Sequence, residues 1–153
     1  MTTNRILFAT DYSKASEDAL RVASSLARDT GAILVVLHVS KLEEQPEGEL
    51  LEGTPEPPQQ DWDRLHQVQP DGGQIPCEYR LVRFKPPGEA QIIVDVAKEE
   101  GVEMIVIGTH GRTGLSRLIA GSVAEEVIRH ANCPVVAVRQ TSPEYEPTLN
   151  IQG

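Results

Sequence analysis

The sequence has few aromatic residues, few cysteines, little basic charge and no long apolar run. Aromatic side chains make up 4% of its 153 residues, so a core must be built mainly from Val, Ile, Leu and Ala. A formal net charge of −9 argues against a nucleic-acid-binding or anionic-membrane-binding surface, because both need clustered Lys and Arg. No run approaches the roughly 18 apolar residues of a membrane span, and no signal-peptide pattern opens the chain. We therefore expect a cytoplasmic protein.

The two cysteines, Cys77 and Cys133, have neither C-x-x-C nor metal-site spacing. We expect both to be reduced core residues, with a disulfide between them as the alternative. The cysteines and the four histidines do not form a four-ligand zinc pattern either.

Apolar segments alternate with helical patterns along most of the chain. The pattern predicts strands at 5–10, 32–39, 77–82, 104–107 and 135–138, and helices at about 13–30, 88–100 and 122–130. The strand at 77–82 alternates in polarity, as expected nearer an edge of the sheet. This alternation predicts an α/β fold, in which a parallel sheet carries helices on both faces through right-handed crossovers.

Residues 41–74 interrupt this alternation with an acidic stretch rich in Pro and Gly. We expect a solvated loop at 41–60, with a partner-binding lid as the alternative, and two helical turns at 61–68 with Trp62, Leu65 and Val68 facing the sheet. Residues 1–139 would form one domain. The polar residues 140–153 would form a loose tail, and the helix at 122–130 would bury Val123, Val127, Ile128 and Ala131.

The clearest functional pattern follows the strand at 104–107. Gly108 and Gly111 are separated by two residues, and nine more residues lead to Gly121-Ser122 at the start of a helical pattern. Ser122 is a good N-cap, and a helix start offers unpaired amides and a positive dipole end to an anion. The glycines leave room for a ligand or permit positive φ. This stretch predicts a phosphate-sized binding loop.

Charged side chains within and near this loop have more than one interpretation. Arg112 and Arg117 could neutralise phosphate charge or could be solvated. His110 could touch a nucleotide or could point at water. His38, inside an apolar strand, is expected to be packed near the end of the sheet.

Several known motifs are absent. The loop is neither a Walker A loop nor a G-x-G-x-x-G fingerprint, and Ser122 is not in a G-x-S-x-G elbow. The combination of base, metal carboxylate and phosphate lysine typical of strong ATPases is also missing. Any ATP hydrolysis should therefore be slow.

The pattern G-x2-G-x9-G-S resembles the nucleotide-binding signature of the universal stress protein family. The opening ILFATDYSKASEDALRVASSLARDTGAILVVLHV is similar to the first half of that family, and the resemblance covers roughly residues 4–39 and 75–139. It implies a Rossmann-like, three-layer, doubly wound fold with strand order 3-2-1-4-5. It also implies a homodimer paired through the last strand, Val135–Val138.

The resemblance further implies a site for ATP or AMP, with Mg²⁺ accompanying the phosphates. Asp11 would face the adenosine part, although alone it could equally be a cap or turn residue. Val39 would meet the adenine edge through its backbone. Ala9 replaces a proline that family members often carry, which should alter packing shape rather than chemistry. The implied site comprises Ala9, Thr10, Asp11, Val39, Gly108, His110, Gly111, Arg112, Gly121, Ser122 and Val123.

Three functions follow from these observations. The first is a dimeric adenine-nucleotide-binding stress-response or signalling module with an unknown protein partner and at most slow ATP hydrolysis. The second is an interaction module of the same fold that binds no nucleotide, although the glycine motif argues against it. The third is an ATPase or nucleotidyl-transfer enzyme, although the Ser-Gly-Gly loop of adenylating relatives is absent after the first strand.

Overall fold

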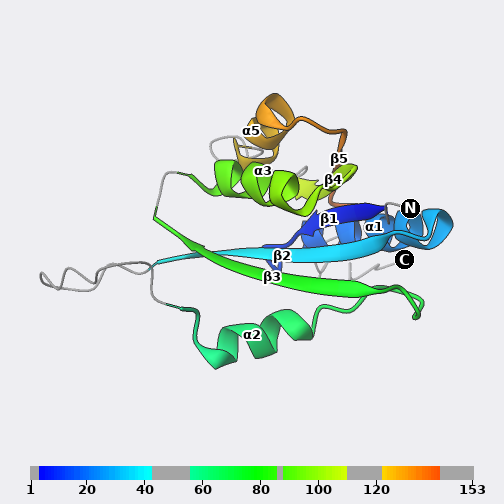
Figure 1. The fold of residues 1–153 in the computed structure, drawn as a ribbon, viewed down its shortest axis with the longest axis horizontal. Coiled ribbons are helices and arrows are strands. Elements are labelled where there is room, and N and C mark those ends of the chain that lie inside the picture. Colours follow the sequence, from blue (N-terminus) through cyan, green and yellow to red (C-terminus); the bar gives the residue numbers. More distant parts are fainter. Residues whose placement is uncertain (1–3, 43–55, 86–87, 110–121, 142–153) are drawn as a thin grey trace, which may run out of the picture.

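The computed structural model describes residues 4–42, 56–85, 88–109 and 122–141, which form a parallel sheet with helices on both faces (Figure 1). The strands are β1 Arg5–Ala9, β2 Ile33–Lys41, β3 Cys77–Phe84, β4 Met104–Thr109 and β5 Val135–Arg139. The helices are α1 Lys14–Thr30, α2 Gln59–His66, α3 Glu89–Glu100 and α5 Ser122–His130. The order β3-β2-β1-β4-β5 confirms the predicted topology. No helix among these residues is both long and apolar enough to cross a membrane.

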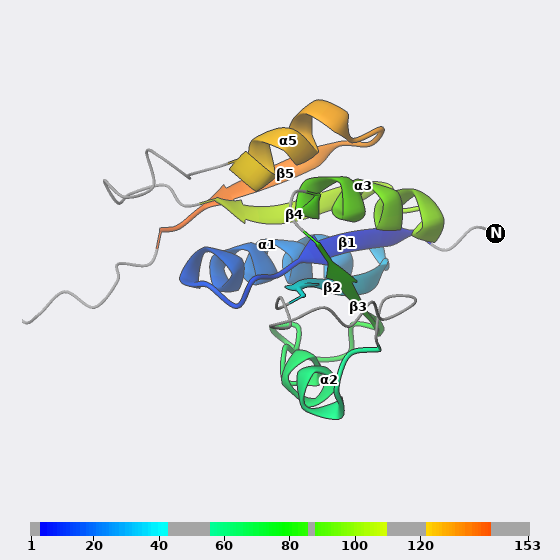
Figure 2. The same cartoon turned by 90° about the vertical axis from the view of Figure 1, so that its left-hand side faces the viewer.

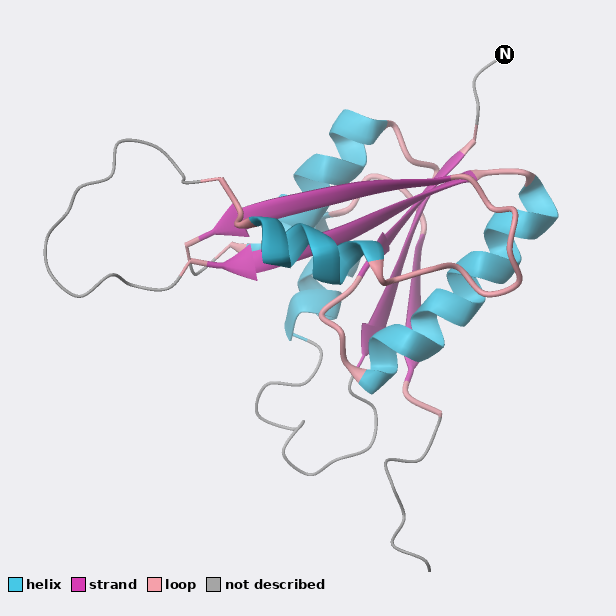
Figure 3. Cartoon of the chain, turned by 90° about the horizontal axis from the view of Figure 1, so that it is seen from below, coloured by secondary structure: helices cyan, strands magenta, loops and turns pink. Residues whose placement is uncertain are grey.

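The sheet has two buried faces, because successive strand residues point to opposite sides. One face packs against α3 and α5, and the other packs against α1 and α2 (Figure 2). Leu7, Leu37 and Ile105 belong to the first face, and Phe8 and Val36 belong to the second. The strands fan out with the usual twist of a parallel sheet (Figure 3).

The helices end where the sequence predicts. Gly31 and Gly101 cap α1 and α3 in the left-handed region, with φ of 70° and 61°. Ser13 caps the start of α1 by accepting a hydrogen bond on Oγ from the backbone N–H of Ser16 at 3.2 Å. α5 spans the predicted residues 122–130, and only the predicted N-cap differs, because Ser122 is the first helical residue rather than the residue before it.

The segment between β2 and β3 contains more regular structure than the sequence suggested. β2 continues to Lys41, and α2 begins at Gln59 rather than 61. Leu65 is fully buried, and Trp62 and Val68 are partly buried in the same cluster, as predicted. The helix itself ends at His66 rather than 68, so Val68 follows it. Residues 43–55 of the predicted loop lie outside the described residues.

Two expectations near the carboxyl end are wrong. Ile128 is 52% exposed, because Ala124 and Val127 make the core contacts of α5 and Ile128 lies about 100° round the helix from Val127. The predicted loose tail does not start at residue 140, and residues 142–153 of it lie outside the described residues. Gln140 is buried, and the backbone N–H of Thr141 donates to Oδ2 of Asp18 at 2.9 Å.

Cys77 and Cys133 are free thiols, as expected. They pack against the clusters on opposite faces of the sheet, so the fold separates them. Burial raises the pKa of both thiols.

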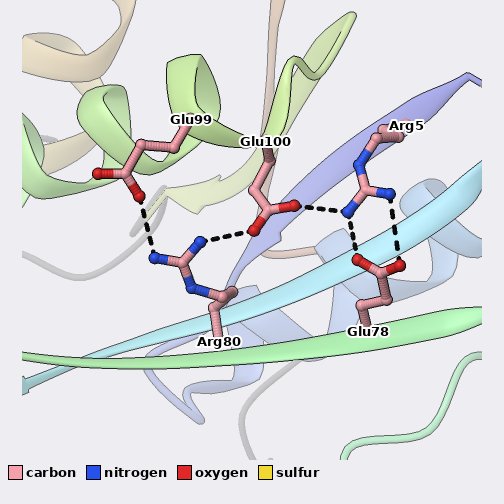
Figure 4. Close-up of polar contacts among 5 residues, drawn as sticks. All are labelled: Arg5, Glu78, Arg80, Glu99 and Glu100. Atoms are coloured by element: carbon pink, nitrogen blue, oxygen red, sulfur yellow. Dashed lines mark hydrogen bonds and ion pairs between the residues drawn. The ribbon is translucent and has the colours of Figure 1, made fainter.

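An ion-pair network covers the sheet near the amino ends of β1 and β3 (Figure 4). Arg80 donates to Glu100 at 2.5 Å and to Glu99 at 3.0 Å. Arg5 donates to Glu100 at 2.5 Å and also contacts Glu78. The Arg80 guanidinium, supported by Arg5, lowers the pKa of the Glu100 carboxyl. We call these five residues the amino-end network.

Candidate functional site

The carboxyl ends of β1, β2 and β4 border a pocket of about 140 Å³ beneath α3 and α5. Its apolar lining consists of Ala9, Leu37, Val39, Ile93, Ile107, Val123 and Ala124. Its remaining lining consists of Thr10, Asp11, Ser16, Glu89, Gly108 and Thr109. Ligands of open parallel sheets bind at this edge, so the position agrees with the predicted site.

The structure brings six of the predicted site residues together as pocket lining: Ala9, Thr10, Asp11, Val39, Gly108 and Val123. Ser122 begins α5, which contributes the next two residues to the pocket. His110, Gly111, Arg112, Arg117 and Gly121 lie outside the described residues. The phosphate-binding part of the site therefore stays a prediction.

Asp11 holds together the loop between β1 and α1. Its Oδ1 accepts hydrogen bonds from the Ser13 backbone N–H at 2.9 Å and from the Ser16 hydroxyl at 2.7 Å. The Asp11 backbone N–H in turn donates to the Ser16 Oγ at 3.2 Å. Asp11 is therefore both a turn residue and part of the pocket wall.

Tyr12 has an uncommon backbone conformation for a bulky residue, with φ of 65°. Its backbone N–H donates to the Thr10 Oγ1 at 3.0 Å. Its ring centroid lies 4.4 Å from that of His38 and 4.0 Å from Cζ of Arg64. A strained conformation of this kind costs about 1–3 kcal/mol and persists only when neighbours hold it. The ring contacts with His38 and Arg64 are such restraints.

The backbone of β2 extends past the end of β1 at the pocket. The Thr10 N–H donates to the Leu37 carbonyl at 2.8 Å, and beyond Thr10 no backbone hydrogen bond from the loop after β1 to β2 is found among the described residues. The Thr10 carbonyl does not bond to the β2 backbone. It accepts a hydrogen bond from Nδ1 of the His38 side chain at 2.7 Å, which confirms the prediction that this histidine is packed near the end of the sheet. Backbone groups alternate sides along a strand, so the Val39 N–H and C=O point toward the β1 side, as those of Leu37 do. These groups are positioned to pair with a ligand.

Gly108 is required by helix packing. A Cβ at this position would lie 2.6 Å from the carbonyl carbon and oxygen of Ala15 and 2.9 Å from the backbone nitrogen of Ser16. The start of α1 thus packs directly on β4. This reason differs from the ligand clearance and positive φ that the spacing suggested, since Gly108 is not among the positive-φ residues of the described chain.

Glu89 is the charged pocket residue that the sequence reasoning missed. It is half-buried at the first position of α3 and makes no hydrogen bond or ion pair with the described residues. Burial, with the nearby charge of Asp11, raises the pKa of its carboxyl. A signal was available, because Glu89 follows a Pro-Pro-Gly break after a strand and so belongs to the same sheet edge as Asp11. The other pocket residues that were not predicted are mostly apolar core residues. Their place at the carboxyl edge of the sheet depends on how the strands are aligned with one another and on how α3 and α5 pack against them.

The described pocket wall combines apolar surface with carboxylate and hydroxyl acceptors. Neither Lys nor Arg is among its lining residues, and the described chain has no group of three metal-binding side chains. Like charge disfavours an anion beside Asp11 and Glu89. This part of the pocket therefore suits an uncharged group with an apolar body and N–H or O–H donors.

Comparison with known proteins gives one consistent result. Residues 2–139 match the universal stress protein family. The chain is 30% identical over 154 residues to universal stress protein MJ0531 of Methanocaldococcus jannaschii, covering 92% of this chain and 84% of the relative. It is 32% identical over 150 residues to universal stress protein YxiE of Bacillus subtilis, covering 89% and 99%.

Solved structures of the same family share the fold. The universal stress protein from Archaeoglobus fulgidus in complex with dAMP has 26% identity and a TM-score of 0.55, and the match covers 90% of this chain and 98% of that one. A universal stress protein in complex with cAMP has a TM-score of 0.62 and covers 92% and 100%. Its 20% identity makes this second likeness evidence for the fold alone.

Proposed function

The chain belongs to the universal stress protein family, and on this premise we propose that it binds an adenine nucleotide, ATP or AMP, in the pocket at the carboxyl ends of β1, β2 and β4. The observation that carries the proposal is the backbone of Val39, which has no partner on the β1 side among the described residues and lies beside an apolar pocket that also contains Asp11. One relative of similar fold, the universal stress protein from Archaeoglobus fulgidus, holds dAMP in its structure, which supports the same ligand class here.

The pocket chemistry favours adenine over guanine. The Val39 carbonyl can accept from the adenine amino group, and its N–H can donate to the neighbouring ring nitrogen. Guanine presents a carbonyl and a ring N–H at these positions, so its donor and acceptor would be reversed. Leu37, Ile93 and Ile107 provide apolar contact for a flat ring. Asp11 and Glu89 can accept hydrogen bonds from ribose hydroxyls.

The phosphates would lie toward the start of α5, away from the two pocket carboxylates. In this pose Ser122 and the loop residues His110, Gly111, Arg112 and Gly121 bind the phosphates, and Mg²⁺ accompanies them with few protein ligands. Gly121→Val should abolish ATP binding and leave the melting temperature unchanged. Unaltered ATP affinity in this variant would contradict the proposed phosphate position.

The protein would act as a dimeric nucleotide-responsive module in the cytoplasm, with at most slow ATP hydrolysis. β5 is an edge strand, its three valines are only partly buried, and Ile128 of α5 is exposed. A second copy pairing along β5 would cover this edge. Ala137→Lys should convert a dimer into a monomer in sedimentation velocity, whereas a monomeric wild-type protein would contradict the dimer.

Calorimetric titration of nucleotide-stripped protein tests the ligand. We expect micromolar binding of ATP with Mg²⁺, weaker or equal binding of AMP, and no heat with GTP. Asp11→Ala should weaken ATP binding about tenfold, the loss expected for one hydrogen bond to a charged group. Asp29→Ala is the matched control, because Asp29 is exposed near the far end of α1.

Two outcomes would contradict the proposal. If the wild-type protein binds no adenine nucleotide, by heat or by melting temperature, the interaction module becomes the better explanation. If Asp11→Ala and Asp29→Ala bind ATP equally well, the nucleotide does not use this pocket.

A further inference from the structure

Three side chains from separate elements meet on the face of the sheet opposite the pocket. Tyr12 belongs to the loop after β1, His38 to β2 and Arg64 to α2. The Tyr12 ring centroid lies 4.4 Å from that of His38 and 4.0 Å from the guanidinium carbon of Arg64, within cation–π range. α2 lies on the α1 side of the sheet, opposite α3 and α5 (Figure 2). The helical part of the pocket lining comes mainly from α3 and α5.

The backbone at Tyr12 fixes the direction of its two neighbours. Asp11 precedes it, and the N–H of Ser13 after it donates to Oδ1 of Asp11 at 2.9 Å. A change of φ at Tyr12 from 65° would therefore reorient the N–H group that holds the Asp11 carboxylate. A bulky residue leaves this left-handed region unless its surroundings prevent it.

His38 anchors the same loop a second time. Its Nδ1 donates to the Thr10 carbonyl at 2.7 Å, and the Thr10 hydroxyl accepts from the Tyr12 N–H at 3.0 Å. Both neighbours of Asp11 thus contact His38: Thr10 through its backbone carbonyl and Tyr12 through its aromatic ring. Arg64 adds a contact from α2, the helix between β2 and β3.

We propose that Tyr12 is a positioning residue of the nucleotide pocket, and that Arg64 couples α2 to the pocket by holding the Tyr12 ring. Tyr12 acts through Asp11 and does not touch the ligand. This inference rests on the proposed function, because it requires that Asp11 contributes to nucleotide affinity.

The first test compares ATP affinities of single variants by calorimetry. Tyr12→Ala should weaken binding about tenfold, as much as loss of the Asp11 hydrogen bond, while Tyr12→Phe keeps the ring and should bind like the wild type. Arg64→Ala should weaken binding about threefold, the effect of an exposed cation–π contact. Asp63→Ala is its control, because Asp63 is exposed on α2 and bonds only to Gln59 among the described residues.

A double-mutant cycle separates positioning from a general loss of structure. If Tyr12 acts through Asp11, the double variant Asp11→Ala, Tyr12→Ala should bind ATP as weakly as Asp11→Ala alone. Losses that multiply would overturn the inference, as would a Tyr12→Ala variant with wild-type affinity. If Tyr12→Ala does not fold, the comparison of Arg64→Ala with Asp63→Ala decides, and equal affinities overturn the coupling.

Failure of the proposed function gives a different result. In that case the wild-type protein does not bind ATP, or Asp11→Ala leaves its affinity unchanged. Failure of this inference alone leaves ATP binding and the Asp11 effect intact and removes only the effects of Tyr12 and Arg64.

Discussion

The two ends of α3 hold carboxylates under opposite conditions. At its last residue, Glu100 bonds to Arg80 and Arg5, and its pKa is lowered. At its first residue, Glu89 has no cationic partner among the described residues and lies near Asp11, and its pKa is raised. α3 therefore carries Glu100, paired with two guanidinium groups, at one edge of the sheet. At the other edge it carries Glu89, which has no cationic partner among the described residues.

This contrast is the reverse of what the helix dipole favours. A carboxylate is stabilised at a helix N-terminus and destabilised at a C-terminus, typically by 0.3–1 kcal/mol in either direction. Glu100 overcomes an unfavourable position because two guanidinium groups contact it directly. Glu89 loses the advantage of its position to burial and to Asp11. The direction of each pKa shift is therefore set by the neighbouring groups rather than by the helix dipole. Glu89, the carboxylate without a cationic partner among the described residues, lies in the pocket, and perturbed pKa values are common at functional sites.

The largest effect should come from breaking the amino-end network. Glu100→Gln leaves Arg5 and Arg80 without their shared partner, and we expect a loss of about 1–2 kcal/mol in the free energy of unfolding at pH 7. Urea denaturation measures the loss. Glu99→Gln is the matched control and should lose less than about 0.5 kcal/mol, because Glu99 is exposed and Arg80 is its one ion-pair partner among the described residues. Equal losses would show that Glu100 is not the centre of the network.

The loss of stability caused by Glu100→Gln should depend on pH. The folded-state pKa of Glu100 is lowered, so its contribution is fully present above the unfolded pKa of about 4.3 and is lost as pH falls through the folded value. The stability difference between the wild type and Glu100→Gln should therefore shrink in acid. A difference that stays constant from pH 7 to pH 3 would mean that packing, rather than charge, accounts for the loss.

A smaller effect of opposite sign should come from Glu89→Gln. Its folded-state pKa is raised, so ionisation destabilises the fold once the pH exceeds the folded value, and this penalty is absent below the unfolded value. We expect the ligand-free variant to be more stable than the wild type by about 0.5–1 kcal/mol at neutral pH. The two should be equal near pH 3. Thermal unfolding at both pH values checks this expectation, and a destabilised variant at pH 7 would contradict it.

Much of the fold could be predicted because its signals are local. Buried parallel strands are nearly continuous apolar runs, and Gly31 and Gly101 mark helix ends through a conformation that favours glycine. Asp11 could be placed at the carboxyl edge for the same reason, since the end of β1 was visible. Val39 was placed by the family resemblance, and β2 continues past it to Lys41. The strand order came from the family resemblance rather than from these patterns.

Predictions failed where a residue's environment depends on elements distant in sequence. Ile128 has the spacing of a buried residue, but no described element covers it. Glu89 enters the pocket because α3 starts at the carboxyl edge of the sheet, where β1, β2 and β4 supply the rest of the lining. Gly108 is needed because α1 packs against β4.

The sequence by itself determined the alternation of strands and helices, the helix ends and the edge of the sheet at which a ligand would bind. These follow from apolar periodicity and from the backbone preferences of single residues, which act over a few positions. The tertiary structure alone decided which carboxylates are neutralised, and it brought Tyr12, His38 and Arg64 together. Charge and ring interactions depend on distances between segments, and those distances exist only after the sheet and its helices have packed.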